Sequence, residues 1–424
     1  MCRSRLRFRT ALLGSTLAIV AFTASAHAGQ MSAELKRTLA ATGMHASASD
    51  SRAASLAHNA HVPGWSYTVL HDFAGAPNDG DGSGAEVTLD SAGNIFGTTD
   101  WGGPYGTGNH FGTLFEVTPD GTESILHSFG ASGDGTNPDG AVTIEANGNM
   151  IGTTTFGGAS NNGTIWQLTA NGTYSILYSF CADQGNFIRG RLVQDGKGNF
   201  YGTALDGGAD SYGTVFKYDP AKNKVAVLHS FNGTDGEFPE HGVVRDRAGN
   251  LYGVTAFGGP YDEGTVYRIA KDGTFSTLYN FTGGSDGGFL YGGLAIDKDG
   301  NLYGSADSGG TPGSGTVFKL APNGTLTVLY NFTGGTDGAY PEGDMLLIGK
   351  TLYSTATGGG DASCQCGVIY KVTAKDREKV LEAFTPTSGN EYSAGLTAVG
   401  GVFYGTTQNG ATGDNGVVFS LTKK

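Results

Sequence analysis

Short segments in which apolar and polar residues alternate recur from residue 65 to the end of the chain. Alternation with a period of two is typical of strands with one buried face. The turns Lys298-Asp-Gly300 and Pro322-Asn-Gly324 place Asp-Gly and Asn-Gly between apolar runs, which is the strongest short-range signal for a β-hairpin. We therefore predict antiparallel units of four strands. In the clearest copy the strands are expected at residues 293–297, 301–305, 316–320 and 326–332.

One small residue marks the second strand of seven such units, at spacings of 50 to 55 residues. A four-stranded unit with that period is typical of a β-propeller blade, whereas a β-helix has a shorter repeat and the leucine-rich consensus is missing. The seven marker residues are Gly97, Gly152, Gly202, Gly253, Gly304, Ser354 and Gly405.

The last unit, residues 394–421, has no fourth strand of its own in the sequence pattern. The segment Tyr67–Phe73 matches the fourth strands Tyr174–Phe180 and Phe275–Phe281. Pairing of this segment with the last unit would close the ring and leave no open sheet edge. The sequence thus predicts an all-β, seven-bladed β-propeller of four-stranded blades, closed by an N-terminal outer strand.

Composition adds most at the N-terminus. The 73 glycines among 424 residues agree with many tight turns. Residues 1–28 combine four arginines, an apolar run and the small-residue site Ala26-His27-Ala28, which is the pattern of a signal peptide. We expect an Ala/Ser/His-rich linker at residues 29–64, with no metal site predicted at its histidines, and the propeller at residues 65–424.

The net charge and the hydropathy pattern bear on partners and location. The formal net charge is −13, and an acidic protein repels phosphate backbones, so nucleic acid is not expected as a partner. Beyond the signal peptide no segment is long and apolar enough to predict a membrane span. We expect a secreted or periplasmic monomer.

One repeat reads Gly249-Asn-Leu-Tyr-Gly253, Gly258-Gly259, Gly264-Thr-Val-Tyr267 and Leu278-Tyr-Asn-Phe281. This order resembles the GloVer tandem repeat, and the resemblance extends from about residue 67 to residue 421. It implies a secreted bacterial repeat protein, in a family in which some members carry a C-terminal sorting anchor, and it implies no catalytic residue. Because the sequence stops at Lys424, just past the last expected strand, we expect a released or periplasmic form.

The connections after the second and fourth strands of each unit are longer and more varied than the other turns. Alternate connections of an antiparallel sheet lie on opposite faces, so these two sets are expected to share one face around the mouth of the central channel. Variable loops on a rigid scaffold commonly carry binding and catalysis, which makes this face the expected functional one.

The repeats provide an internal control for candidate residues. His71, His127 and His229 occupy one slot of the fourth strand, which tyrosines fill in other units, so we interpret them as packing residues. Trp166 stands in a slot of core phenylalanines and is interpreted in the same way. Within the propeller, two histidines fit no repeated slot, His110 and His241.

A possible catalytic group is expected at the channel mouth. His241 follows Glu240, Arg189 and Arg191 stand near the matching place one blade earlier, and Tyr291 stands there one blade later. A histidine or tyrosine base with an arginine near a carboxylate suits proton abstraction next to a uronic acid, the chemistry of polysaccharide lyases. The alternative is a polar channel lined by hydrogen-bonded residues.

A second set of candidates would bind a ligand. Trp101, Phe156 and Phe257 share one slot in the second-strand loops, where they could stack on sugar rings or pack against the neighbouring blade. Asp139 and Glu342 are acidic rim candidates, and with Glu240 they are the carboxylates that a glycoside hydrolase would require in pairs.

No cofactor or metal is predicted. The Asp-Gly loops could hold calcium through oxygen ligands, but the complete calcium-loop spacing is missing and aspartate favours such turns unaided. A local disulfide between Cys364 and Cys366 is left open.

Two functions follow from these features. The leading hypothesis is a secreted binding or scaffold propeller that recognises a glycan or another cell-surface ligand on its loop face. The alternative is a polysaccharide-active enzyme, a lyase before a hydrolase, with its site at the channel mouth. A purely structural role in the envelope is the third.

Overall fold

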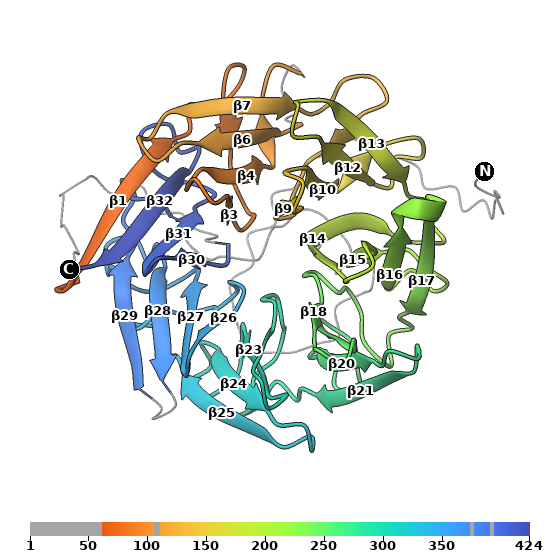
Figure 1. Cartoon of the computed structure of the whole chain (residues 1–424). Coiled ribbons are helices and arrows are strands. Elements are labelled where there is room, and N and C mark those ends of the chain that lie inside the picture. The colour runs from red at the N-terminus through yellow and green to blue at the C-terminus, as the bar shows by residue number, and fades with distance from the viewer. Residues whose placement is uncertain (1–61, 106–110, 374–376, 391–393) are drawn as a thin grey trace, which may run out of the picture. The chain divides into compact units, whose positions relative to one another are not determined.

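The computed structural model describes residues 62–424 except 106–110, 374–376 and 391–393. The predicted signal peptide and almost all of the predicted linker therefore lie outside the described residues, as does His110. The described chain forms seven four-stranded antiparallel sheets arranged as blades around a central channel (Figure 1). The predicted all-β, seven-bladed architecture is confirmed. In the described part of the chain, no helix is long and apolar enough to cross a membrane.

Each blade is built from strands in chain order from the channel outward, and the last blade takes its outermost strand from the N-terminal end of the described chain. Blade 1 holds β3 (Thr88–Leu89), β4 (Ile95–Thr99), β6 (Thr113–Val117) and β7 (Glu123–Ser128); blade 2 holds β9 (Thr143–Ile144), β10 (Met150–Thr154), β12 (Thr164–Leu168) and β13 (Tyr174–Ser179); blade 3 holds β14 (Asn186–Gln194), β15 (Phe200–Asp206), β16 (Thr214–Asp219) and β17 (Lys224–Ser230); blade 4 holds β18 (Val244–Arg245), β19 (Leu251–Thr255), β20 (Thr265–Ile269) and β21 (Phe275–Asn280).

The other three blades follow the same plan. Blade 5 holds β22 (Ala295–Ile296), β23 (Leu302–Ala306), β24 (Thr316–Leu320) and β25 (Leu326–Asn331); blade 6 holds β26 (Leu346–Ile348), β27 (Thr351–Ala356), β28 (Val368–Thr373) and β29 (Arg377–Ala383); blade 7 holds β30 (Thr397–Val399), β31 (Val402–Thr406), β32 (Val417–Lys423) and β1 (Trp65–Asp72). The remaining elements are β2 (Gly80–Asp81), β5 (Trp101–Gly102), β8 (Gly135–Thr136), β11 (Phe156–Gly157) and the 3₁₀ helix η1 (Pro220–Lys222).

The N-terminal strand closes the ring as predicted. β1 pairs antiparallel with β32, in a register that runs from Trp65 opposite Lys423 to Asp72 opposite Val417. The ring of Tyr67 lies 5.1 Å from that of Phe419, and its hydroxyl donates a hydrogen bond of 2.5 Å to the carbonyl of Ser388. Closure therefore rests on a full strand ladder and on apolar packing, because no covalent bond joins β1 to blade 7 in the described chain.

The small marker residue of the second strand lies under an aromatic ring of the third strand. A Cβ at Gly152 would lie 2.3 Å from the Trp166 indole, and a Cβ at Gly304 would lie 2.7 Å from the Phe318 ring. Trp166 is fully buried, which confirms its core role. The repeated glycine is thus explained by close packing inside each blade.

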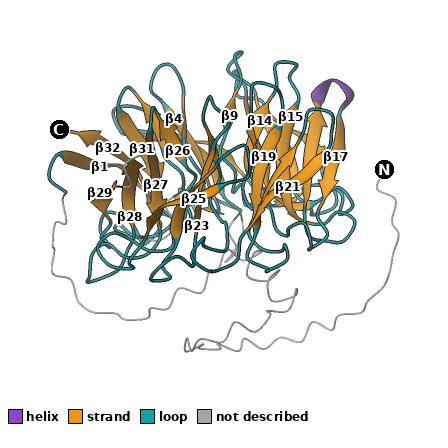
Figure 2. Cartoon of the chain, turned by 90° about the horizontal axis from the view of Figure 1, so that it is seen from below, coloured by secondary structure: helices purple, strands orange, loops and turns teal. Residues whose placement is uncertain are grey.

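The connections after the second and fourth strands do share one face. β2 and β5 pair with each other, β8 and β11 do the same, and isolated bridges replace these small sheets in four other blades. Figure 2 shows the ring edge-on, with η1, which joins a third strand to a fourth, on the opposite face. Short antiparallel pairs therefore link the two sets of long connections on the face that the sequence predicts to be functional.

Candidate functional site at the channel

The fourth-strand connections enter the channel through a residue with a left-handed backbone, φ between 55° and 58°, in five blades. In blade 4 this residue is Phe238: its N–H donates to the carbonyl of Tyr212, and its carbonyl accepts from the N–H of Ala256, both at 3.0 Å. A bulky residue rarely adopts this conformation, so the surrounding backbone must hold it. The turn brings the residue two positions later to the channel. These rim residues are Asp139, Arg189, Glu240, Tyr291 and Glu342.

The rim residues interact from one blade to the next. Arg189 lies between two carboxylates: its Nε is 2.9 Å from Asp139 Oδ2, and its Nη1 is 3.5 Å from Glu240 Oε2. Glu240 is 5% exposed, and its burial raises its pKa even though the Arg189 charge opposes the shift. All five residues belonged to the two predicted sets, and the structure places them at equivalent points of five consecutive blades.

A second group of charges follows the rim at the start of the innermost strands. Arg191 Nη2 lies 3.1 Å from Glu86 Oε2, and His241 Nδ1 lies 2.8 Å from Asp344 Oδ1. The side chains of His241 and Asp344 are 27% and 31% exposed, so both remain accessible from the channel. We call Glu86, Arg191, His241 and Asp344 the inner group.

Burial and neighbouring charges shift the pKa values of the inner group. Burial, opposed by Arg191, raises the pKa of Glu86 to about 7. Burial lowers the pKa of His241, but the Asp344 carboxylate more than reverses this and raises it to about 9. His241 is therefore a cation at neutral pH.

A buried acid pair completes the lining. Burial raises the pKa of Asp307 to about 7, although a hydrogen bond with Glu342 opposes the shift. Burial and the Asp307 charge raise the pKa of Glu342 well above its usual value. Burial, then Glu240, also raises the pKa of Tyr291. At neutral pH the acid pair holds a proton, and Tyr291 is a neutral phenol.

Sequence reasoning missed four acids of the channel: Glu86, Asp344, Asp307 and Asp100. Burial and the Asp139 charge raise the pKa of Asp100. A signal for two of them was present in the repeat. Glu86 and Asp344 stand two residues before the inner strand, in the slot that Gly242, Gly293 and Gly395 fill in other blades. A charged residue in a slot of glycines is an exception of the kind that identified His241.

The aromatic candidates pack against the neighbouring blade. Phe257 is only 3% exposed, and its ring lies 5.1 Å from that of Phe289. The ring of Phe156, which is half-buried, lies 5.0 Å from that of Phe187. Trp101 is also half-buried and covers Gly82, where a Cβ would lie 2.9 Å from the indole. The packing alternative fits Phe257, whereas Trp101 and Phe156 remain partly exposed.

The Asp-Gly loops bind protein donors through their aspartates. Asp134 Oδ2 lies 2.9 Å from His127 Nε2, and Asp286 accepts from the N–H of Thr282 at 3.0 Å and from the hydroxyl of Tyr279 at 3.1 Å. The fourth-strand histidines and tyrosines therefore fix the loop that follows them. Cys364 and Cys366 form a disulfide within the second-strand loop of blade 6.

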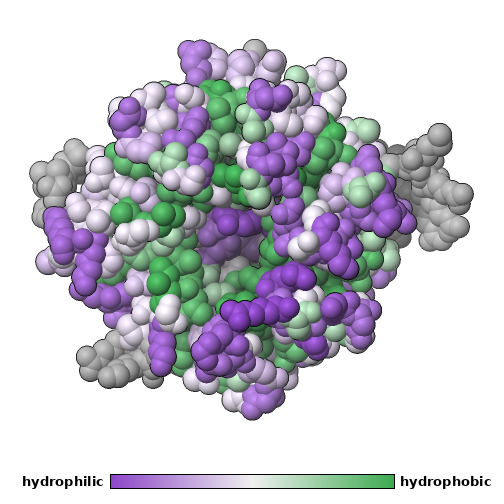
Figure 3. Space-filling view, viewed as in Figure 1, coloured by the Kyte–Doolittle hydropathy of each residue, from purple (hydrophilic) through white to green (hydrophobic). Residues whose placement is uncertain are grey.

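Figure 3 looks down the channel from the face that carries η1, opposite to the long connections; the centre of this face is hollow, with hydrophilic residues in the hollow and hydrophobic residues around it. This channel combines fixed charges of both signs with acids that hold protons at neutral pH. Such a lining can donate and accept many hydrogen bonds at once. The pKa directions of His241 and Tyr291 leave neither of them as a ready base.

Comparisons with known proteins agree with the fold. The model of the Gloeobacter/Verrucomicrobia repeat matches residues 43–247 and 239–424. No curated protein matches the chain. An extracellular domain assigned to the one-component system BT4673 of B. thetaiotaomicron is similar in structure, with a TM-score of 0.53 and 12% identity over 84% of this chain and 40% of that chain.

Two further structures are similar to the described propeller. A second structure of the BT4673 extracellular domain, titled as a hybrid two-component system, gives a TM-score of 0.51 at 12% identity and covers 83% of this chain and 39% of that one. PorZ, a surface component of the type-IX secretion system of Porphyromonas gingivalis, gives 0.48 at 14% identity, over 81% of this chain and 47% of that one. The chain thus spans less than half the length of these proteins.

Proposed function

Since the chain belongs to the Gloeobacter/Verrucomicrobia repeat family and forms a closed propeller, we propose that it is an exported binding module whose channel mouth recognises a glycan. One observation carries this proposal. The scaffold residues repeat from blade to blade, whereas the rim position varies among Asp, Arg, Glu and Tyr over five consecutive blades. Export rests on the signal-peptide pattern of residues 1–28.

The scaffold does not need these charges. Blade 1 has Gly84 at the rim position, and three blades have glycine where the inner group places Glu86 and Asp344. Removing charges from water is unfavourable unless they are paired, and such clusters with shifted pKa values are concentrated at functional sites. The channel charges are therefore better explained by a ligand than by folding.

The charge balance favours a glycan without acidic groups. Arg189 is paired with Asp139 and Glu240, and Arg191 is paired with Glu86, so the carboxylates already neutralise both arginines. The carboxylates can accept hydrogen bonds from sugar hydroxyls, and the exposed parts of Trp101 and Phe156 offer apolar surface to a sugar ring. A uronic acid would therefore find both arginines already paired with carboxylates of the protein.

The alternative is a polysaccharide-active enzyme, and one observation favours a hydrolase over a lyase. A lyase needs an unprotonated base, whereas His241 is a cation and Tyr291 a neutral phenol at neutral pH. The Asp307–Glu342 pair, in contrast, holds a proton at neutral pH, as the general acid of a glycoside hydrolase must. Hydrolysis of the bound glycan would establish this second function.

Binding is tested with the mature chain on an array of neutral and acidic glycans, followed by titration calorimetry of each ligand found. We expect Glu240→Gln and Asp139→Asn to weaken binding by about tenfold or more, because each loses a charge-assisted hydrogen bond. Asp299→Asn is the control, since this aspartate is 65% exposed and lies in a first-to-second-strand turn, on the opposite face. Absence of glycan binding, or equal binding by all three variants, would contradict the proposal.

A further inference from the structure

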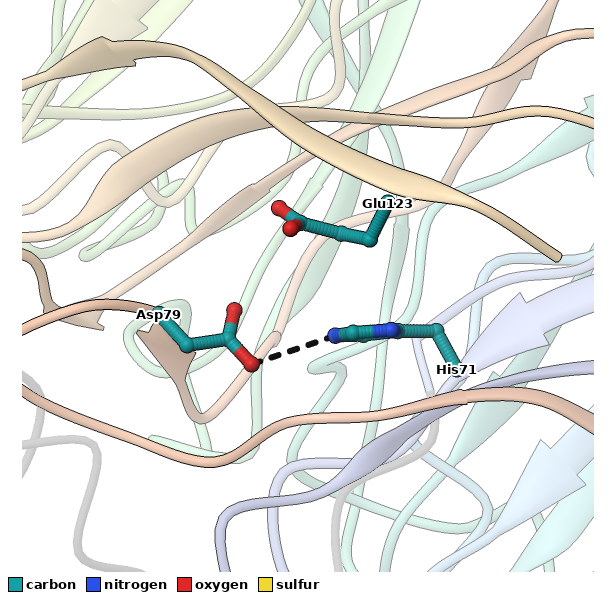
Figure 4. Close-up of side chains that lie close together, drawn as sticks. All are labelled: His71, Asp79 and Glu123. Atoms are coloured by element: carbon teal, nitrogen blue, oxygen red, sulfur yellow. Dashed lines mark hydrogen bonds and ion pairs between the residues drawn. The ribbon is translucent and has the colours of Figure 1, made fainter.

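The junction between the last and the first blade gathers three side chains of the metal-binding type. His71 comes from the closing strand β1, Asp79 from the connection that follows it, and Glu123 from β7 of blade 1. One ligand atom of each residue lies within 4.8 Å of the others, and His71 Nε2 is 3.2 Å from Asp79 Oδ2. Figure 4 shows the imidazole and the two carboxylates directed toward a common centre.

The equivalent junctions show what this position holds when it serves packing alone. Where His127 pairs with Asp134, Tyr174 stacks on the imidazole at 3.6 Å between ring centroids. Where His229 pairs with Asp235, Phe275 stacks in the same way, also at 3.6 Å. At the closure Glu123 stands in this aromatic slot, and an acid replaces the ring over His71.

Another junction has the acid but lacks the histidine. Glu378 occupies the slot of Glu123 in blade 6, where it faces Tyr330 and Asp337. Burial raises the pKa of Glu378, and the charge of Asp337 adds a smaller rise. A neutral phenol is a poor metal ligand there. Among the described residues, only the closure joins histidine, aspartate and glutamate in one group.

The geometry at the closure suits a divalent ion. Two ligands that each bind a tetrahedral ion at about 2.1 Å lie about 3.4 Å apart, close to the separation of the His71 and Asp79 atoms. Asp79 is held in place by the N–H groups of Ala74 at 2.7 Å and Gly80 at 2.6 Å. Glu123 Oε1 is buried and accepts no hydrogen bond within the described chain.

We propose that His71, Asp79 and Glu123 bind a divalent transition-metal ion, for which Zn²⁺ is the best match, and that this ion ties the closing strand to blade 1. A neutral imidazole and two carboxylates balance the charge of the ion. An imidazole ligand selects zinc and its neighbours over calcium and magnesium, which prefer oxygen ligands alone. The proposal assigns His71 a role beyond the packing that its repeat slot predicts.

The test titrates Zn²⁺ into the metal-free mature chain without an affinity tag, and follows thermal unfolding with and without excess Zn²⁺. We expect bound zinc to raise the melting temperature, because an ion that binds only the folded ring stabilises it. His71→Tyr and Glu123→Gln should each lose one bound equivalent together with this rise. His71→Tyr copies the junction of Tyr330, Asp337 and Glu378, so the fold accommodates it.

His229→Tyr is the matched control, because it makes the same substitution in the same repeat slot. At that junction Phe275 stands in the place of Glu123, so the third ligand is missing. It should bind as much Zn²⁺ as the parent. Any zinc bound by histidines before residue 62 is common to all variants and cancels in the comparison. Failure of the parent to bind Zn²⁺, or equal binding by His71→Tyr, Glu123→Gln and His229→Tyr, would overturn the proposal.

Discussion

At the scale of single residues, the seven marker positions show how packing fixes a sequence pattern. A Cβ at Gly304 would lie 2.7 Å from the Phe318 ring and 2.8 Å from the Leu294 side chain. We expect Gly304→Ala to lower the free energy of unfolding by about 1–3 kcal/mol, the usual range for overpacking a core. Gly196→Ala is the control, since a Cβ there meets nothing within 4 Å and the backbone is not left-handed. Urea unfolding of both variants measures the difference, and equal values would contradict this explanation.

Single residues also show how much of the candidate site the sequence reveals. His241, Arg189 and Glu240 were predicted because they break the repeat, and the structure brings them together in the channel. Asp307 and Asp100 were missed because their importance depends on neighbours from other blades, Glu342 and Asp139, at distances that one sequence does not define. The buried state of Phe257 was equally undetermined, because a repeated aromatic serves packing and stacking alike.

At the scale of the element, the channel lining should set how stability depends on pH. The folded pKa of Asp307 and of Glu86 is raised to about 7, so the unfolded chain releases these protons earlier, and folding loses stability as pH rises from about 4 to 7. The raised pKa of His241, about 9, has the same sign: its contribution is complete below the unfolded value of 6.5 and is lost as pH rises through 9.

Aspartates with lowered pKa values, such as Asp134 and Asp337, limit stability at the acidic end, since their contribution is lost as pH falls below their unfolded value of 3.8. Together these two sets of groups place the maximum of stability at mildly acidic pH, between about 4 and 5. We expect Asp307→Asn to raise the melting temperature at pH 8 by roughly 2–4 °C and to leave it nearly unchanged at pH 4, where the acid is protonated. Calorimetric melting at both pH values, with Asp299→Asn as control, measures this. A larger gain at pH 4 would contradict it.

Strand order was more predictable than strand bounds. The fourth strand of each unit was recognised from its apolar spacing and its final phenylalanine, and that assignment extended to Tyr67–Phe73 at the other end of the chain. The innermost strand of the clearest copy proved shorter than the expected residues 293–297, since β22 spans only Ala295–Ile296, whereas β14 of blade 3 extends over Asn186–Gln194. The ring narrows toward the channel, where turns and charged side chains take the space that strands occupy farther out.

At the scale of the whole molecule, the ring depends on one strand that is distant in sequence from its partner. β1 supplies Trp65, which is 6% exposed, and Tyr67, which packs on Phe419, to the core of blade 7. A chain that begins at residue 74 would expose the edge of β32 and lose these contacts, whereas a chain that begins at residue 62 keeps them.

Loss of one large buried aromatic commonly costs about 3–5 kcal/mol, and an open edge also invites aggregation. We expect the melting temperature of the shorter chain to fall by about 10 °C or more, or the chain to aggregate. The longer chain should keep the melting temperature of the parent. Equal melting of the two truncated chains would show that seven blades hold together without their closing strand.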